Sequence, residues 1–414
     1  MTFIQRHWLF LTPLLAISAF YGVQNLPGAI SLQSEFVILF LHICGVSVLS
    51  YAACYFIVPT NWLQQSFPKL VLDRQLNVGA LTGLSLYILV LFVAVITADH
   101  VPLLAAFQGA GGGDLAEYRE TFLRARTGPW QILNYLYVIL NNSVMPIVVT
   151  YAFWKKRHWR FLAGAIFVVG LSLTLQKGAI ASAALPLAAL FLMNRQWRSL
   201  IVVVIMLFAF IAAMYVIASG RLSSILPTTG SWHESSEAPA SVELADPFFN
   251  ASDVPAEYNL LGGTNQITLA FNRIAWIPYV TAIDWLRYQE VVLNGDMVLG
   301  RSIKPVALLL GLPPLHIERE VSSFQWGQNS TGTSSSNAIF IVDAFVNFGW
   351  IGVVLYSGLF AFSIKLIVRT GFDPLIASAI VPVYTACFVP LPPVFLSGGL
   401  AIFVVLALFL RAPD

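Results

Sequence analysis

The residues of this sequence that could do chemistry are few, because only 10% of its 414 residues are charged. Two of them, Lys177 and Asp343, lie within apolar runs. An ionisable group at membrane depth is costly and is a functional candidate by default. We therefore treat both as candidates. The competing interpretations are that Lys177 reaches the membrane surface along its own stem and that Asp343 lies high enough to stay hydrated.

A second group of ionisable residues is crowded between positions 316 and 320. His316, Glu318 and Glu320 lie there beside Arg319, and a carboxylate or an imidazole can accept a proton from a hydroxyl group. A strip rich in hydroxyls and amides follows, from Trp326 to Asn337. Such a strip suits sugars, which offer hydroxyl donors and acceptors and a C–H face for stacking. A flexible Ser/Thr linker is the competing interpretation.

Cationic side chains recur in a helical pattern between Leu115 and Arg126. Arg119 and Arg126 are seven residues apart, a spacing that places both on one face of a helix. Glu120 and Arg124 are instead spaced as an i,i+4 ion pair that satisfies itself. Arg119 and Arg126 are therefore the cations of this patch that remain for a ligand.

A second helical pattern, rich in Ile, Leu, Trp and Tyr, runs from about 265 to 292. Arg273, Asp284 and Arg287 fall within an arc of about 60° on it. This predicts a helix on the outer leaflet of a membrane, with its polar stripe turned toward a cavity. The competing interpretation is a stabilising Asp284–Arg287 pair at i,i+3, whereas Arg273 has no carboxylate three or four residues away.

Membrane helices must position these side chains, because a chain with 58% hydrophobic residues cannot be a soluble enzyme. Ordinary soluble domains carry roughly 25% charged residues, and a membrane helix needs about 20 apolar residues. One helix over 161–193 would be about 50 Å long, which exceeds a single span, so we divide it at Gln176-Lys177-Gly178. The predicted spans are 8–26, 34–58, 77–97, 130–153, 161–175, 178–193, 199–218, 338–364, 375–391 and 395–410.

The expected fold is therefore an all-α polytopic membrane protein with about ten transmembrane helices. Residues 1–218 hold helices 1–7 with a smaller outer loop at 98–129, residues 219–337 form a large, partly helical outer loop, and residues 338–414 hold helices 8–10. Arg301 belongs to the large loop and precedes an apolar run that is too short to span. Lys and Arg accumulate in alternate short loops, which predicts that both termini are cytoplasmic.

Charge and motifs exclude several classes of protein. A net charge of +2 gives no sign of a nucleic-acid-binding surface. Cys44, Cys54 and Cys387 lie in apolar runs without CxxC or Cys/His spacing, so we interpret them as small core residues. The sequence has no DxD, HExxH, GxSxG, Walker lysine or GxGxxG motif. We therefore expect no metal site, no cofactor and no nucleic-acid partner.

The arrangement resembles that of the Wzy-type oligosaccharide repeat-unit (O-antigen) polymerases of bacterial inner membranes. The similarity covers most of the chain: ten or more spans, one large periplasmic loop late in the sequence, and a smaller Arg-bearing loop before it. Locally, Tyr118-Arg119-Glu120 and Gln176-Lys177-Gly178 look like the family, as does the stretch SSSNAIFIVDAFVNFGWIG, which ends at Gly352.

That last stretch is similar to the motif with which these polymerases and the related O-antigen ligases open the helix after the large loop. It has an amide-rich start and a Gly-x-x-Gly formed by Gly349 and Gly352. Members of the ligase-like branch usually carry His-Asn near the start of this helix, whereas this chain has Ser336-Asn337. A histidine base at that place is therefore in doubt.

The resemblance implies periplasmic-side glycosyl transfer that polymerises undecaprenyl-pyrophosphate-linked oligosaccharide repeat units into a surface polysaccharide. A pyrophosphate leaving group needs cations, and the acceptor hydroxyl needs a base. The residues that we nominate as the base are Glu318, Asp343, Glu320 and His316, with the first two favoured. The residues that we nominate for substrate binding are Arg119, Arg126, Lys177, Arg273, Arg287, Arg301 and Trp326.

The resemblance also implies partners and a location. It implies lipid-linked oligosaccharides as substrates, membrane lipids around the helices, a chain-length regulator and a flippase as candidate partners, and a multi-pass placement in the bacterial inner membrane. Two alternatives stay open: a ligase-like or O-acyl transferase acting on the same glycans, and a transporter or flippase for a lipid-linked glycan. A transporter would use charged residues within its spans, whereas most charge here lies in long outer loops.

Overall fold

The computed structural model describes most of the chain as helices. The described residues are 3–32, 34–67, 73–108, 110, 112–124, 126, 128–175, 181–218, 256–262, 268, 271–326 and 335–410. Among them every regular element is a helix, and no strand occurs. The all-α prediction is therefore confirmed for this part of the chain, while Lys177 and residues 219–255 of the large loop lie outside it.

Six helical segments of the described residues are long and apolar enough to cross a membrane. They are His7–Ser31, Glu35–Ile57, Asp73–Ile96, Gly128–Trp154, Trp197–Met214 and Phe340–Arg369. The other four predicted runs coincide with the shorter apolar helices Arg160–Ser172, Ser182–Met193, Asp373–Ala386 and Leu400–Phe409. At about 1.5 Å per residue these four are shorter than the hydrocarbon core. A polytopic membrane protein is confirmed, whereas ten crossings stay a prediction.

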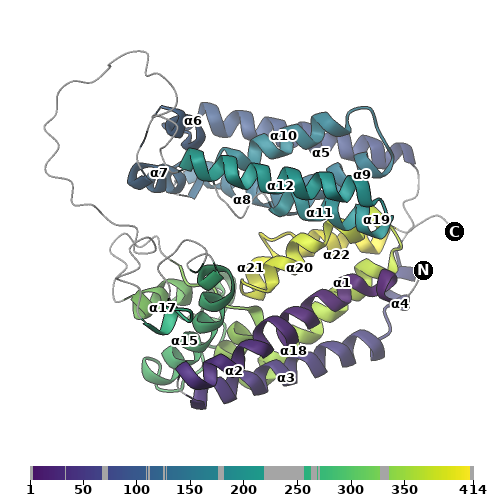
Figure 1. The fold of residues 1–414 in the computed structure, drawn as a ribbon. Coiled ribbons are helices and arrows are strands. Elements are labelled where there is room, and N and C mark those ends of the chain that lie inside the picture. The colour runs from purple at the N-terminus through teal and green to yellow at the C-terminus, as the bar shows by residue number, and fades with distance from the viewer. Residues whose placement is uncertain are drawn as a thin grey trace, which may run out of the picture.

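The helices form two blocks with a third group between them (Figure 1). The first block contains α1 (Phe3–Leu15), η1 (Ala16–Tyr21), α2 (Gly22–Ser31), α3 (Ser34–Ile57), α4 (Asn61–Gln65) and α18 (Phe340–Arg369). The second contains α5 (Asp73–Ile96), α8 (Gln131–Ile139), η4 (Leu140–Val144), α9 (Met145–Trp154), α10 (Arg160–Ser172), α11 (Ala181–Met193) and α12 (Trp197–Ala218). Between them lie α19 (Asp373–Ser378), α20 (Ile380–Ala386), α21 (Leu391–Phe395) and α22 (Leu400–Phe409), which contact both blocks.

Shorter elements gather at one end of these blocks (Figure 1). Beside the second block lie α6 (Pro102–Phe107), α7 (Gly112–Arg119), η2 (Glu120–Arg124) and η3 (Gly128–Trp130). Beside the first block lie η6 (Ala256–Tyr258), η7 (Asn272–Trp276), α15 (Ile277–Val291), α16 (Lys304–Leu309) and α17 (Ile317–Trp326). We call this the loop end. The large loop that was predicted from sequence is thus partly helical.

The largest helix pair, α3 with α18, packs closely through small side chains. The hydroxyls of Ser47 and Ser357 are 2.7 Å apart, and the Cys54 thiol donates to the carbonyl of Gly358 at 3.1 Å. Small residues let helix backbones approach closely in a membrane. Cys54 is half-buried, Cys44 and Cys387 are buried, and all three are free thiols, as predicted.

The run 161–193 is divided as predicted, because the chain reverses direction between α10 and α11. The ring of Phe153, at the end of α9, lies 5.5 Å from Phe161 at the start of α10. The same ring lies 6.1 Å from Phe191 at the end of α11. The start of α10 and the end of α11 therefore share one end of the molecule, which a single straight helix could not achieve.

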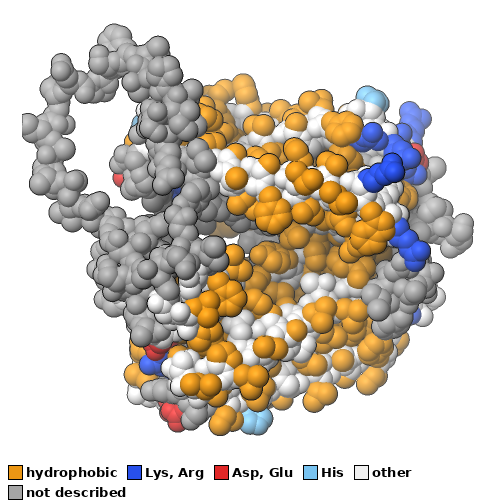
Figure 2. All heavy atoms as spheres, viewed as in Figure 1, with side chains coloured by type: hydrophobic (Ala, Val, Ile, Leu, Met, Phe, Trp, Pro, Cys, Tyr) orange, Lys and Arg blue, Asp and Glu red, His pale blue; other side chains and the backbone are white. Residues whose placement is uncertain are grey.

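Basic side chains collect at the end of the molecule opposite to the loop end (Figure 2). α1 begins and α18 ends there (Figure 1), and Lys155 and Arg157 pair there with Asp73 at 3.3 and 2.8 Å. We call it the basic end. Between the two ends the surface is largely apolar (Figure 2). On α12, for example, Ile205 and Phe208 are exposed, and an exposed apolar area of this extent marks a membrane-facing surface.

Helix α18 is interrupted at Gly349, whose φ of 61° and ψ of −149° are not helical. Glycine adopts this backbone conformation at little cost, whereas residues with a Cβ rarely do. The interruption frees backbone carbonyls that the segment after α15 satisfies. The Val298 N–H donates to the Val346 carbonyl at 3.0 Å, and the Leu299 N–H donates to the Asn347 carbonyl at 2.9 Å. The irregular backbone is thus hydrogen-bonded by protein, as a membrane interior requires.

Replacement of Gly349 by alanine should destabilise the protein by about 1–3 kcal/mol, because the added Cβ would force an unfavourable φ. That Cβ would also come within 2.7 Å of the Met297 methyl group. Gly358→Ala in the same helix is the matched control, since its Cβ would meet only Cys54, at ordinary contact distances of 3.8–3.9 Å. The check is thermal unfolding of the purified proteins in detergent. Equal melting temperatures for the two variants would contradict the role of Gly349.

Candidate functional site

Asp343 and Asn347 lie at the start of α18, directly before the interruption. Asp343 is 1% exposed, and its Oδ1 accepts a hydrogen bond from the Asn347 side-chain amide at 2.9 Å. The Asn347 Oδ1 in turn accepts from the Gly300 N–H at 3.1 Å and from the Ser302 hydroxyl at 3.0 Å. Asn347 therefore connects the segment at 300–302 to the Asp343 carboxylate.

One oxygen of the Asp343 carboxylate is left over by this arrangement. Its Oδ2 is buried and has no hydrogen-bond partner among the described residues. A buried carboxylate oxygen without a partner loses much of its solvation and gains no hydrogen bond that compensates for the loss. Sites of this kind call for an explanation, and a functional one is common.

Glu318 is the second nominated acid that the fold brings to this place. It lies in the first turn of α17, and its carbonyl accepts from the Ser336 N–H at 2.9 Å, just ahead of α18. Burial raises the pKa of the Glu318 carboxyl, and the nearby His316 and Arg319 lower it in part. The Glu318 and Asp343 carboxylates also repel one another. Thus the two acids favoured from sequence are neighbours in the structure.

The other two nominated base residues are placed less favourably. His316 and Glu320 belong to the same segment as Glu318 but are exposed. Glu318 is thus half-buried, whereas its sequence neighbours Glu320 and His316 are exposed. Among the described residues, no group of three or more His, Cys, Asp or Glu side chains could hold a metal ion.

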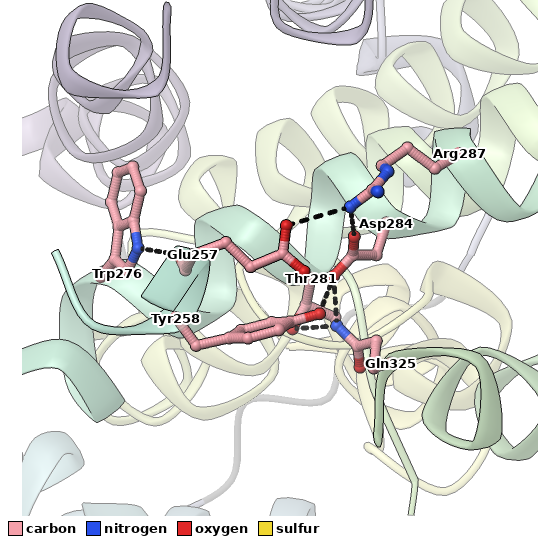
Figure 3. A network of polar contacts seen from close by, with 7 residues as sticks. All are labelled: Glu257, Tyr258, Trp276, Thr281, Asp284, Arg287 and Gln325. Atoms are coloured by element: carbon pink, nitrogen blue, oxygen red, sulfur yellow. Dashed lines mark hydrogen bonds and ion pairs between the residues drawn. The ribbon is translucent and has the colours of Figure 1, made fainter. Parts of the chain in front are cut away.

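A polar network centred on Asp284 holds the helices beside this site together (Figure 3). The Asp284 Oδ2 accepts hydrogen bonds from the Tyr258 hydroxyl at 2.6 Å and from the Gln325 amide at 2.8 Å. Its Oδ1 pairs with Arg287 at 3.0 Å, and Arg287 also pairs with Glu257 at 3.3 Å. The network therefore joins η6, α15 and α17.

The network shows that α15 is not a helix lying on the membrane surface. Asp284 is 1% exposed, and every residue from Tyr279 to Leu286 is buried. Burial raises the pKa of the Asp284 carboxyl, although its hydrogen bonds and Arg287 oppose the shift. The prediction that Asp284 lies on a polar stripe facing a cavity is therefore wrong, because α3, α17 and α18 all pack against this helix. The alternative of a stabilising i,i+3 pair is the one observed.

Arg273 does not share a face with this pair. It lies in the π-turn η7 and is exposed, whereas Asp284 is buried. A π-turn has more residues per turn than an α-helix, so an angle counted at α-helical spacing cannot be carried across it.

Trp326 and Arg301 flank the same region. The Trp326 ring lies 4.7 Å from the Tyr258 ring at an interplanar angle of 33°, which leaves the indole half-buried at the end of α17. The Arg301 Nε donates to the Pro313 carbonyl at 3.2 Å, so that this side chain helps to close the loop 301–315. The following run includes α16, whose Leu309 is 87% exposed and offers an apolar contact at the loop end.

Arg119 and Arg126 lie beside the second block. Arg126 is hydrogen-bonded to protein groups, whereas one nitrogen of Arg119 has no hydrogen-bond partner among the described residues. Arg126 donates to the Phe122 and Ala94 carbonyls at 2.7 and 2.8 Å and to the Thr97 hydroxyl, so it connects η2 to the end of α5. Arg119 is half-buried, and its Nε has no hydrogen-bond partner among the described residues. Burial lowers the pKa of Arg119.

Several residues of the site carry no signal in the sequence. Nothing in the spacing of Tyr258 or Gln325 connects them to Asp284, because each comes from a different segment. Asn347 could be found as a polar residue within an apolar run, but not its hydrogen bonds to 300–302. Residue pairs that are 26 to 47 positions apart meet only after the helices have packed.

Comparison of the chain with protein-family models, with curated proteins and with solved structures finds no match.

Removal of the Tyr258 hydroxyl should destabilise the protein by about 1–3 kcal/mol, because a buried carboxylate would lose a donor. Tyr258→Phe keeps the ring that stacks on Trp326 and removes only the 2.6 Å hydrogen bond to Asp284. The matched control is Tyr288→Phe on α15, a buried tyrosine. Thermal unfolding in detergent measures both variants. If Tyr288→Phe lowers the melting temperature as much as Tyr258→Phe does, the Asp284 network is not what stabilises this end.

Proposed function

We propose that this protein polymerises undecaprenyl-pyrophosphate-linked oligosaccharide repeat units by glycosyl transfer on the periplasmic side of a bacterial inner membrane. One observation carries the proposal. The half-buried Glu318 and the buried, incompletely hydrogen-bonded Asp343 lie within electrostatic range of one another at the loop end, where the interruption of α18 begins. A pair of carboxylates at such a place can accept the proton of an acceptor hydroxyl.

The proposed topology has ten crossings with both termini in the cytoplasm. Six helices are long enough to cross alone, and the four shorter ones sit at the remaining apolar runs. Pairs of short helices can complete a crossing when loops or neighbouring helices cover their ends. Basic residues concentrate on the cytoplasmic side of membrane proteins. The basic end, with Lys155 and Arg157, is therefore assigned to the cytoplasm and the loop end to the periplasm.

In the proposed reaction Glu318 is the general base. The acceptor hydroxyl oxygen forms a bond to the anomeric carbon of the donor glycan while that carbon's bond to the pyrophosphate oxygen breaks. The hydroxyl proton passes to the Glu318 carboxylate, and the electron pair leaves with undecaprenyl pyrophosphate. A raised pKa suits this role, since a general base works best when its pKa approaches the operating pH. Burial provides that shift at Glu318.

Asp343 is assigned a positioning role, because it is 1% exposed and cannot meet a substrate as directly as Glu318 can. It lies within electrostatic range of Glu318. Its hydrogen bond from Asn347 also ties the acid to the segment at 300–302.

The leaving group requires cations, for which Arg119 is the best-supported candidate. Its guanidinium is half-buried at the loop end and has an Nε without a partner among the described residues. Arg forks suit phosphate oxygens, and preorganised cations stabilise charge that develops in a transition state. Arg287 is already compensated by two carboxylates, so we rank it, with Arg126, below Arg119. Arg273, Arg301 and Lys177 remain further candidates.

A transporter or flippase for the same lipid-linked glycans is the second candidate, because the interruption of α18 favours it. Discontinuous helices with buried polar residues form the substrate sites of many transporters. A ligase-like transferase would use the same loop-end carboxylates. One assay separates the polymerase from the other two: purified protein given a single lipid-linked repeat unit yields a ladder of chain lengths only if it polymerises.

In that assay Glu318→Gln should lower the rate of chain extension by about 10²- to 10⁴-fold, the usual contribution of a general base. Asp343→Asn should also slow extension, because it alters the hydrogen bond by which Asn347 holds this side chain. The matched control is Glu290→Gln, an exposed acid at the end of α15, which should extend chains at the wild-type rate. Normal ladders from both Glu318→Gln and Asp343→Asn would exclude these carboxylates, and the absence of any ladder from the wild type would exclude polymerisation.

Arg119→Gln should reduce extension by about 10²- to 10³-fold, comparable to the loss of one transition-state donor. Arg126→Gln should reduce stability more than rate, because its three hydrogen bonds fix the end of α5. Initial rates at saturating donor, together with melting temperatures, distinguish the two effects. The assignment of Arg119 fails if its variant melts early and yet extends chains normally once folded.

A further inference from the structure

A cavity of about 590 Å³ opens at the basic end, far from the proposed active site. It lies where α18 ends against α1, α3 and α4, and the polar residues that line it are His7, Tyr55, Asn61, Gln64, Lys365 and Arg369. Lys365 and Arg369 are one helical turn apart on α18, so both cations face the same space. Two like charges at this spacing repel one another, which an anion between them would relieve.

Most hydrogen-bond donors of these two cations remain available. The Lys365 ammonium donates to the Val58 carbonyl at 2.6 Å and to the Phe56 carbonyl at 3.5 Å, at the end of α3. The Arg369 guanidinium donates once, to the Thr60 hydroxyl at 3.2 Å. A guanidinium has five N–H donors and an ammonium three. The two side chains are therefore held in place by a few bonds, and the rest of their donors can meet a ligand.

No carboxylate neutralises this pair among the ion pairs of the described residues. Asp73 also lies at the basic end, but it pairs with Lys155 and Arg157 instead. A cavity lined by uncompensated cations and neutral donors selects an anion, and phosphate oxygens match the guanidinium fork.

The surroundings of the cavity indicate that the phosphate belongs to a lipid. Phe56 and Ile57, next to it on α3, are 59% and 77% exposed on the apolar face of the helices. Trp62 of α4 is also exposed, and tryptophan is enriched where a membrane meets water. An acyl chain could therefore lie along α3 while its headgroup enters the cavity, and basic pockets between transmembrane helices bind such headgroups.

We propose that this cavity is a binding site for the phosphate group of an anionic membrane lipid, held by Lys365 and Arg369 at the basic end. The site is independent of the proposed glycosyl transfer, since it lies at the other end of the molecule. It would fasten the ends of α3 and α18 to the lipid headgroup layer.

The test is native mass spectrometry of the full-length protein in detergent, titrated with phosphatidylglycerol or phosphatidylcholine. We expect preferential binding of phosphatidylglycerol, because both lipids carry a phosphate but only the first has a net negative charge. Each basic residue near an anionic lipid surface contributes about a fivefold gain in affinity. Arg369→Gln should therefore bind phosphatidylglycerol about fivefold more weakly, and the double variant Lys365→Gln/Arg369→Gln about 25-fold more weakly.

The matched control is Arg195→Gln/Arg198→Gln, which removes two exposed cations from the same end but outside the cavity and should bind within twofold of wild type. Arg369 makes a single side-chain hydrogen bond, so the single variant decides the outcome if the double variant does not fold. Equal binding of the two lipids, or unchanged binding by Arg369→Gln, would overturn the proposal. Displacement of phosphatidylglycerol by millimolar inorganic phosphate would also overturn it, since the ligand would then be a soluble anion.

Discussion

The loop end of this molecule depends on how the interruption of α18 is hydrogen-bonded. Gly349 turns the chain out of helical geometry, which would leave backbone carbonyls unpaired inside an apolar protein. The segment 298–300 supplies the missing donors, and Asn347 adds a side-chain acceptor for the same segment. Because each unpaired buried group would cost free energy, the interruption and that segment can exist only together.

This constraint explains why the carboxylates lie where they do. Fixing 298–300 against α18 positions the chain that leads through α16 to α17, and α17 carries Glu318 to within electrostatic range of Asp343. The Asp284 network then fastens α17 to α15 through Gln325. Stability and the proposed chemistry are thus connected. The hydrogen-bonded polar groups of the loop end hold Asp343 in place, and its Oδ2 has no hydrogen-bond partner among the described residues.

The two ends of the molecule handle charge differently. At the loop end, Asp284 and Asp343 are buried, and burial raises the pKa of Glu318 and of Asp284. At the basic end, cations remain at the surface or line a cavity, and Asp73 is compensated by two of them. Basic loops alternate with other loops along the chain, and the fold collects them at one end of the molecule. This asymmetry supports the proposed orientation.

Composition and hydrophobic run length alone determined the class of the protein, the place of each apolar helix and the reversal between α10 and α11, because these follow from local hydrophobicity and length. The sequence also singled out Asp343 as an ionisable residue within an apolar run and Glu318 as one of the ionisable residues crowded between 316 and 320. Only the tertiary structure decided that these two lie within electrostatic range of one another, that Arg287 pairs with two carboxylates while the Arg119 Nε has no hydrogen-bond partner among the described residues, and that α15 is buried. The reason is physical: pairing and burial depend on residues brought together from distant parts of the chain, and helical periodicity carries no information about them.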